Sequence, residues 1–120
     1  MTRAAGRDLD ALVAVRVMEL TPCDRYSHSP ADAGLLTDGQ GFFAVPYYST
    51  QIGAAWEVLE KLRADGLTMM QSVNHGEAGW WCVLYPHAGP PAETAYAETA
   101  PLSICWAALE FVGLSPETTR

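Results

Sequence analysis

Residues 80–85, Trp-Trp-Cys-Val-Leu-Tyr, form the segment that most limits how this chain can fold. Their composition and the turn-forming residues before them predict a β-strand, with residues 80, 82 and 84 on one face and 81, 83 and 85 on the other. Both faces are apolar. Such a strand must be covered on both sides, or the sheet must gain a further strand, which another chain could supply.

A second strand is predicted over Leu67–Val73, and Asn74–Gly79 joins the two strands as a hairpin loop. A two-stranded ribbon is only marginally stable in water. We therefore expect the sheet to be completed by a partner in a homo-oligomer.

Apolar residues at helical spacing predict a first helix over residues 8–20, with Asp8 and Asp10 at the positive end of its dipole and Pro22 ending it. A last helix is predicted over residues 99–113, where Thr99 can cap and Pro101 suits the first turn. It is apolar around most of its circumference. It must therefore be buried on two sides, or on one side in an oligomer interface.

A helix between these two begins after a Ser49-Thr50 cap and ends at Asp65-Gly66. Glu57 and Lys61 are spaced to pair on its exposed side. The stripe expected to face the core contains Ile52, Ala55, Trp56, Leu59 and Leu62.

Residues 21–48 show no regular period and are predicted to form a long irregular loop, with one short extended piece at 41–45. Residues 86–100 are predicted as a connector and 114–120 as a loose tail. The order helix, loop, helix, strand, strand, helix predicts a single α+β domain over residues 1–120.

The chain of 120 residues has a net charge of −7, and its seven Lys and Arg residues form no basic run. This argues against binding to duplex nucleic acid, which depends on clustered cations. The apolar runs are too short to span a membrane. The first ten residues hold two aspartates where a secretory signal needs an apolar core, so we expect a cytoplasmic protein.

Reactive chemistry has weak candidates. Cys82 with His75 or His87 is the one thiol–base pairing, but Pro86 separates Cys82 from His87 and the spacing puts them on opposite faces of a strand. The histidines, cysteines and carboxylates show no metal-ligand spacing. We therefore expect no catalytic residue, no metal, no cofactor and no enzymatic activity.

Aromatic residues mark the candidate binding site. A helix N-terminus offers N–H groups to an anion, and aromatic faces stack on bases. The candidate ligand-binding residues are Tyr47, Tyr48, Asn74, His75, Trp80 and Trp81, with Arg16 as the candidate cation because it interrupts the apolar stripe of its helix. The alternative is that the tryptophans simply form the core. The exposed face of the middle helix is not expected to take part.

Several segments together resemble the small phage and prophage proteins of the phage ABA sandwich family: residues 9–14 with 16–18, 48–50 with 52–62, 80–82, and 99–109. The resemblance implies a sheet between helical layers, and a phage-encoded accessory protein acting in the host bacterial cytoplasm. Many members carry a basic residue near the position that Trp106 occupies here. A phosphate site on the last helix is therefore not expected.

These observations favour a non-enzymatic phage protein that antagonises a host anti-phage defence system. It could do so by sequestering a nucleotide-type signal molecule in a cleft shared between subunits. An alternative is an acidic inhibitor directed at a host or CRISPR-type nuclease, since the chain is acidic. A small hydrolase using Cys82 is the least favoured alternative.

Overall fold

The computed structural model describes residues 5–23, 35–37, 42–93 and 96–113, and the expected tail at 114–120 lies outside them. The elements in chain order are α1 (Arg7–Arg16), β1 (Thr21–Cys23), β2 (Leu35–Thr37), β3 (Phe42–Ala44), α2 (Ile52–Ala64), β4 (Leu67–Asn74), the 3-10 turn η3 (Gly76–Ala78), β5 (Trp80–Pro86), β6 (Ala92–Glu93) and α3 (Ala100–Phe111). The predicted α+β class is confirmed.

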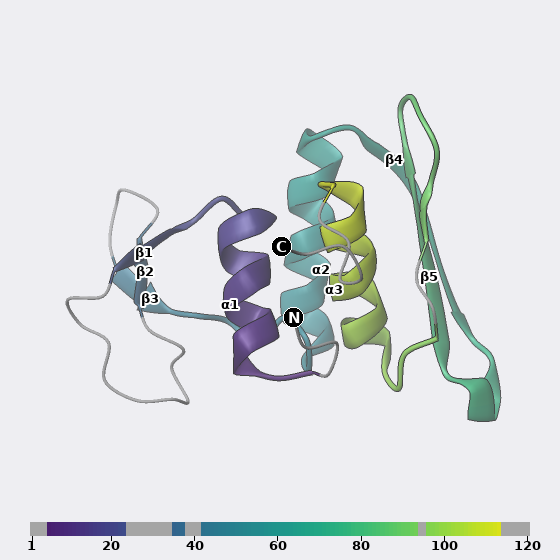
Figure 1. The fold of residues 1–120 in the computed structure, drawn as a ribbon, viewed down its shortest axis with the longest axis horizontal. Helices are drawn as coiled ribbons and strands as arrows, with labels where there is room; N and C mark the ends of the chain where they lie inside the picture. Colours follow the sequence, from purple (N-terminus) through teal and green to yellow (C-terminus); the bar gives the residue numbers. More distant parts are fainter. Residues whose placement is uncertain (1–4, 24–34, 38–41, 94–95, 114–120) are drawn as a thin grey trace.

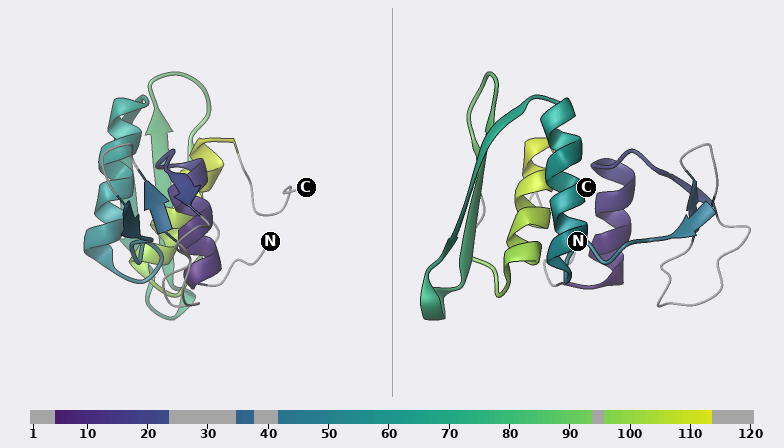
Figure 2. Two further views of the ribbon diagram at one scale, coloured as in Figure 1. Left: turned by 90° about the vertical axis from the view of Figure 1, so that its left-hand side faces the viewer. Right: turned by 180° about the vertical axis from the view of Figure 1, so that it is seen from behind.

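The elements stack in layers along the longest axis. Figure 1 shows the small sheet β1-β2-β3 at one end, then α1, then α2 and α3, and the larger sheet β4-β5-β6 at the other end. The view from behind in Figure 2 shows the same order. All described helices therefore lie on one side of the larger sheet, and no described helix covers its other face.

Helix α3 is the centre of the core. Its cap is the predicted one, because Thr99 Oγ1 accepts a hydrogen bond from Leu102 N at 3.3 Å and Pro101 occupies the first turn. It packs against α1 and α2 on one side and against the larger sheet on the other. Its fully or almost fully buried residues are Leu102, Ser103, Ile104, Cys105, Ala107, Ala108 and Leu109. Burial on two sides within one chain explains its nearly continuous apolar surface.

The hairpin of β4 and β5 is confirmed, with Asn74 opposite Trp80 and Ser72 opposite Cys82. The strand that extends the sheet comes from the same chain, since β6 places Glu93 opposite Val83. The segment 86–100 is thus not only a connector. Two residues of strand are too short to show any periodicity in sequence.

Strand β5 is buried on both faces at its middle. Cys82 and Leu84 point into the helical core, and Val83, which is 2% exposed, lies on the other face and does not belong to that core cluster. Trp81 and Tyr85 share that outer face and are only partly buried. The outer face of the larger sheet is therefore left partly apolar.

The prediction of one irregular loop over 21–48 is wrong in part. Strands β1, β2 and β3 form a small antiparallel sheet, and the extended piece expected at 41–45 is β3. Each strand has three residues, which is too few to give an alternating pattern.

The predicted end of the first helix is wrong. Helix α1 ends at Arg16, well before Pro22, and Glu19 in the following turn has φ 59°. Asp8 and Asp10 lie in the first turn, as predicted. Asp10 is in addition fully buried, which the sequence does not indicate.

Helix α2 is rotated relative to its predicted stripe. Ala55, Val58, Leu59 and Leu62 are buried, whereas Ile52 is 55% and Trp56 54% exposed. Gln51, not Ser49-Thr50, is the N-cap. Lys61 pairs with Glu19 at 2.9 Å and with Asp65, not with Glu57. The predicted stop is confirmed, since the helix ends at Ala64 and Gly66 has φ 111°.

Candidate functional site

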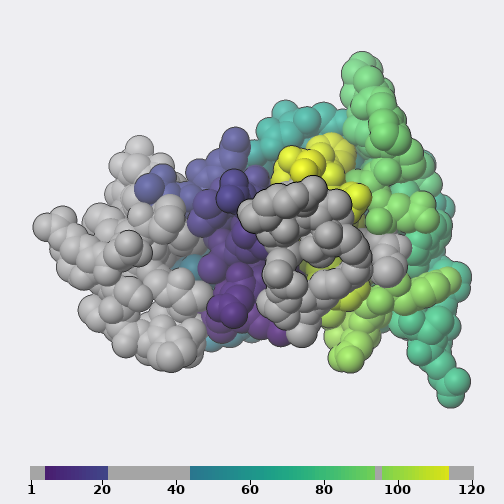
Figure 3. Space-filling model, viewed as in Figure 1, coloured from purple at the N-terminus to yellow at the C-terminus, as the bar shows by residue number. Residues whose placement is uncertain are grey.

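The hairpin loop is held by hydrogen bonds between its own residues. Asn74 Oδ1 accepts a hydrogen bond from Gly76 N at 2.8 Å, and His75 N donates to Gly79 O at 2.8 Å. Beyond the loop, Trp80 and Ala97 exchange both backbone hydrogen bonds, at 2.7 and 2.9 Å. These bonds bring the segment that leads into α3 against the start of β5. Figure 3 shows this end of the hairpin standing out from the body of the molecule.

An aromatic cluster lies on this hairpin. The ring of His75 meets Trp81 edge-on at a centroid distance of 6.2 Å and Tyr96 edge-on at 5.2 Å. Tyr96 is 50% exposed. The sequence analysis missed Tyr96 because the segment around it was interpreted as a connector. The segment that contains Tyr96 lies beside β5 because of the bridge between Trp80 and Ala97, and no local sequence pattern predicts this bridge.

A hollow of about 370 Å³ adjoins Tyr96. Its walls are Tyr96, Glu98 and the first turns of α3, where Leu102 and Trp106 supply apolar surface. Glu98 is the one charged side chain among the described lining residues. The hollow thus offers an aromatic and apolar wall for a flat ring system, but the described residues bring no cation to it.

Tyr47 and Tyr48 do not join the hairpin cluster. They precede α2, whereas the hairpin tip projects beyond the far side of α3 (Figure 1). Tyr48 is 1% exposed and belongs to the core. Tyr47 is 42% exposed and lies beneath the guanidinium of Arg7, whose Cζ is 3.9 Å from the ring centroid. The predicted site is therefore divided into two separate places.

A buried polar cluster explains why Tyr47 and Tyr48 lie where they do. Arg7 Nη1 donates to Asp10 Oδ2 at 2.7 Å, and Ser49 N donates to Asp10 Oδ1 at 2.7 Å. Arg7 also donates to the carbonyls of Val45 and Pro46. The cluster fastens the start of α1 to the segment before α2. These contacts indicate a structural role for Tyr47 and Tyr48.

Arg16 is exposed at the other end of α1 from Arg7. At 1.5 Å per residue the two positions are about 14 Å apart along the helix axis. The structure therefore places Arg7, not Arg16, beside Tyr47. It brings Arg16 to neither half of the predicted site.

Cys82 is poorly suited to act as a nucleophile. It is fully buried, and burial raises the pKa of its thiol to about 12. A thiolate is the nucleophilic form, so this environment suppresses it. His75 and His87 are exposed, away from the core that holds Cys82. Among the described residues, no group of three or more His, Cys, Asp or Glu residues is placed to hold a metal ion.

Burial of Tyr48 makes the fold sensitive to alkaline pH. Desolvation, with the charges of Glu57, Cys105 and Asp10, raises the pKa of Tyr48 from 10.0 to about 12. The folded state therefore keeps a proton that the unfolded chain loses near pH 10, and this stabilisation disappears as the pH rises through about 12. Two pKa units correspond to about 2–3 kcal/mol. Between pH 10 and 12 we expect the free energy of unfolding to fall less in Tyr48→Phe than in the wild type, measured by urea unfolding at each pH. The same pH dependence in both proteins would contradict the assignment of this effect to Tyr48.

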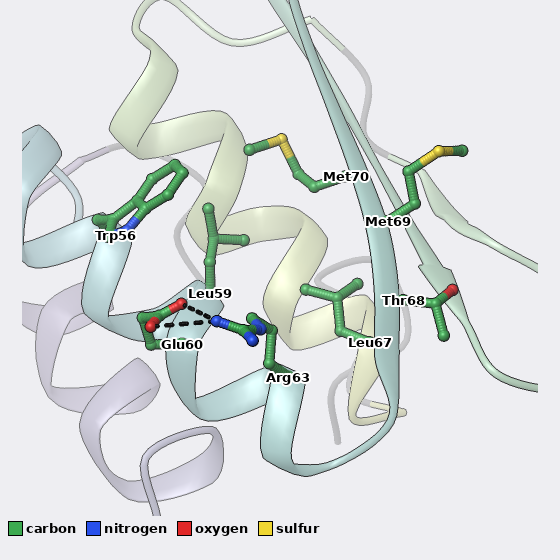
Figure 4. Close-up of a pocket in the computed structure, with 8 residues that line it drawn as sticks. All are labelled: Trp56, Leu59, Glu60, Arg63, Leu67, Thr68, Met69 and Met70. Atoms are coloured by element: carbon green, nitrogen blue, oxygen red, sulfur yellow. Dashed lines mark hydrogen bonds and ion pairs between the residues drawn. The ribbon is translucent and has the colours of Figure 1, made fainter.

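A second hollow, of about 150 Å³, lies between α2 and β4. Figure 4 shows Trp56, Glu60 and Arg63 on its helical side and Met70 and Leu67 on its strand side. Arg63 Nη1 pairs with Glu60 Oε2 at 3.0 Å. The sequence analysis placed Trp56 in the stripe that faces the core, yet its ring is 54% exposed and borders this concave surface.

The comparisons with known proteins identify the family. The model of the phage ABA sandwich domain matches residues 11–109, which include all the described elements except the first turn of α1 and the last residues of α3. Searches of curated proteins and of solved structures found no significant match. No helix in the described part of the chain is long and apolar enough to cross a membrane. Both the family match and the arrangement of helices and antiparallel strands lead to one conclusion: this chain belongs to the phage ABA sandwich domain family.

Proposed function

We propose that this chain is a non-enzymatic phage binding protein that sequesters a nucleotide-type signal molecule and so antagonises a host anti-phage defence system. The observation that carries the proposal is the aromatic cluster of His75, Trp81 and Tyr96 beside the hollow at the start of α3. The match to a phage domain family supports the biological setting.

The chemistry of this surface suits a nucleobase. Aromatic rings stack on bases at a gain of about 1–3 kcal/mol each. The hollow of about 370 Å³ lies in the size range of small-molecule sites, which runs from roughly 300 to 1,000 Å³. Asn74 lies at the base of the same loop, and an amide side chain can hydrogen-bond to the edge of a base.

The charge of the surface supports a homo-oligomer. A phosphate-bearing ligand needs positive charge, and the described lining of the hollow contains Glu98 but no Lys or Arg. A second copy of the chain can supply the missing cation. In this proposal the ligand lies in a cleft shared between subunits, and the partner also extends the larger sheet.

A thermal-shift screen tests the binding proposal, because a ligand that binds only the folded state raises the melting temperature. The probes are cyclic mononucleotides, cyclic dinucleotides and ADP-ribose derivatives. Tyr96→Ala should weaken binding of a responding probe by about 1–3 kcal/mol through loss of stacking. Tyr47→Ala is the matched control, since Tyr47 is a similarly exposed tyrosine at the start of α2. The proposal fails if no probe responds, or if the two variants weaken binding equally.

Protein-directed inhibition is the second candidate, and the net charge of −7 is the observation that favours it. An acidic surface can dock on a basic host or CRISPR-type nuclease, and such an association weakens as salt screens the charges. Co-purification of a nuclease that is lost at high salt, without any response to nucleotide probes, would favour this candidate over the first.

A further inference from the structure

The open edge of β4 has the properties of a pairing surface. Within the described residues β4 pairs with β5 alone, so its other edge presents free N–H and C=O groups. Its eight residues, Leu-Thr-Met-Met-Gln-Ser-Val-Asn, include no charge and no proline. Proteins protect long exposed edges with lysines, prolines or bulges. Here the one protection is a bulge between Leu67 and Met69, which leaves the rest of the strand regular.

The surface of α2 beside this edge is also incompletely covered. Ile52 is 55% and Trp56 54% exposed, on the side of α2 that borders the second hollow. Helix α2 packs over β4 while α3 packs over β5 and β6, so α2 and the open edge lie on the same flank of the molecule. A protein that pairs with β4 therefore also contacts the ring of Trp56.

Charge favours a second copy of this chain as the protein that pairs with β4. The whole chain carries −7, so most surfaces of two copies repel each other. The strand β4 adds no charge, and the adjoining part of α2 presents Glu60 and Arg63 together, 3.0 Å apart. A surface that carries both signs is complementary to itself under a two-fold rotation.

We propose that two copies of this chain pair through β4, antiparallel about a two-fold axis, with Ile52 and Trp56 of the two α2 helices covering the joint. The inference rests on the proposed homo-oligomer and names its contact surface. It joins two three-stranded sheets into one of six strands, with α2 and α3 of both copies on the same face.

This pairing also brings a cation to the candidate site. In an antiparallel pair, the start of one β4 lies beside the end of the other. Arg63, in the last turn of α2, closely precedes the start of β4, and His75 follows its end. Arg63 of the second copy is thereby carried toward the hairpin loop, where the described residues of one chain bring no positive charge to the hollow.

Light scattering on the full chain with two variants tests the proposal. The wild type should have twice the 13.0 kDa mass of the chain at micromolar concentration. Trp56→Glu should raise the dimer dissociation constant about tenfold or more, as loss of a central aromatic in an interface does. Met70→Lys, which places a charge in the edge strand, should act in the same direction. The control is Val15→Glu on α1, where the valine is 37% exposed, and this variant should remain dimeric.

Amide hydrogen exchange provides a second measurement. The N–H groups on the open edge of β4 should be protected in the wild type and exchange faster in Trp56→Glu. Those that β4 and β5 donate to each other should stay protected in both proteins. A wild-type monomer would overturn this inference together with the proposed oligomer. If the wild type is a dimer and both variants leave it intact, the dimer exists but does not form through β4. If Trp81→Glu dissociates the dimer and Trp56→Glu does not, the contact is the outer face of the larger sheet and not the edge of β4.

Discussion

Replacing Arg7 with methionine should lower the free energy of unfolding by about 3–5 kcal/mol, because it leaves a buried carboxylate without its cation. Asp10 is 0% exposed, and Arg7 is its paired charge at 2.7 Å. Arg7 also donates to the carbonyls of Val45 and Pro46, which would lose a donor. The measurement is urea unfolding at neutral pH.

Two further variants separate the buried pair from general effects of charge. Arg16→Met removes an exposed arginine at the end of the same helix and should cost about 0.3–1 kcal/mol. The double variant Arg7→Met with Asp10→Asn removes both charges and should be more stable than Arg7→Met alone. If Arg7→Met costs no more than Arg16→Met, the pair does not hold the two segments together.

Replacing Gly79 with alanine should open the bridge between the hairpin and the segment before α3. Gly79 has φ 103° and ψ −157°, a conformation adopted essentially by glycine alone. Holding an alanine in this conformation costs about 1–3 kcal/mol of stability. A Cβ at this position would also lie 2.4 Å from the backbone oxygen of Ala97, so the backbone must move. Because Ala97 holds Tyr96 in place, the variant should lose the aromatic cluster and the proposed binding.

The matched control for this change is Gly76→Ala in the same loop. Gly76 has φ 66°, but a Cβ there meets nothing within 4 Å. This variant should cost about 1–2 kcal/mol for the left-handed backbone and keep the bridge. Amide exchange at Trp80 and Ala97, with the ring signals of His75, distinguishes the two outcomes. Equal protection of the bridge in both variants would show that the close approach to Ala97 is not required.

The sequence predicted best where structure is decided by neighbouring residues. The hairpin of β4 and β5 follows from alternation on either side of a Gly-containing turn, and both the cap and the first turn of α3 follow from Thr99 and Pro101. The stop of α2 follows from Gly66 in the same way. Each of these features involves contacts between residues close in the chain.

The sequence failed where a distant partner decides the role of a residue. Asp10 lies in the first turn of α1 as predicted, but its burial could not be predicted because its hydrogen bond from Ser49 spans 39 residues. Helical spacing placed Trp56 in the stripe with Ala55, yet Trp56 is 54% exposed and Val58 is buried instead, where α2 packs against α3. Tyr96 gained its role from the single bridge between Trp80 and Ala97.

The small sheet has a consequence for how such a chain can diversify. Its strands contact chiefly one another, and the chain enters and leaves it at two anchored points, with Leu20 packed against the core and Val45 2% exposed within it. The three described strands between these anchors lie outside the layers that hold the candidate site (Figure 1). Strands β1, β2 and β3 are therefore an addition to the layered domain, and substitutions in them should leave the packing of α1, α2, α3 and the larger sheet unchanged.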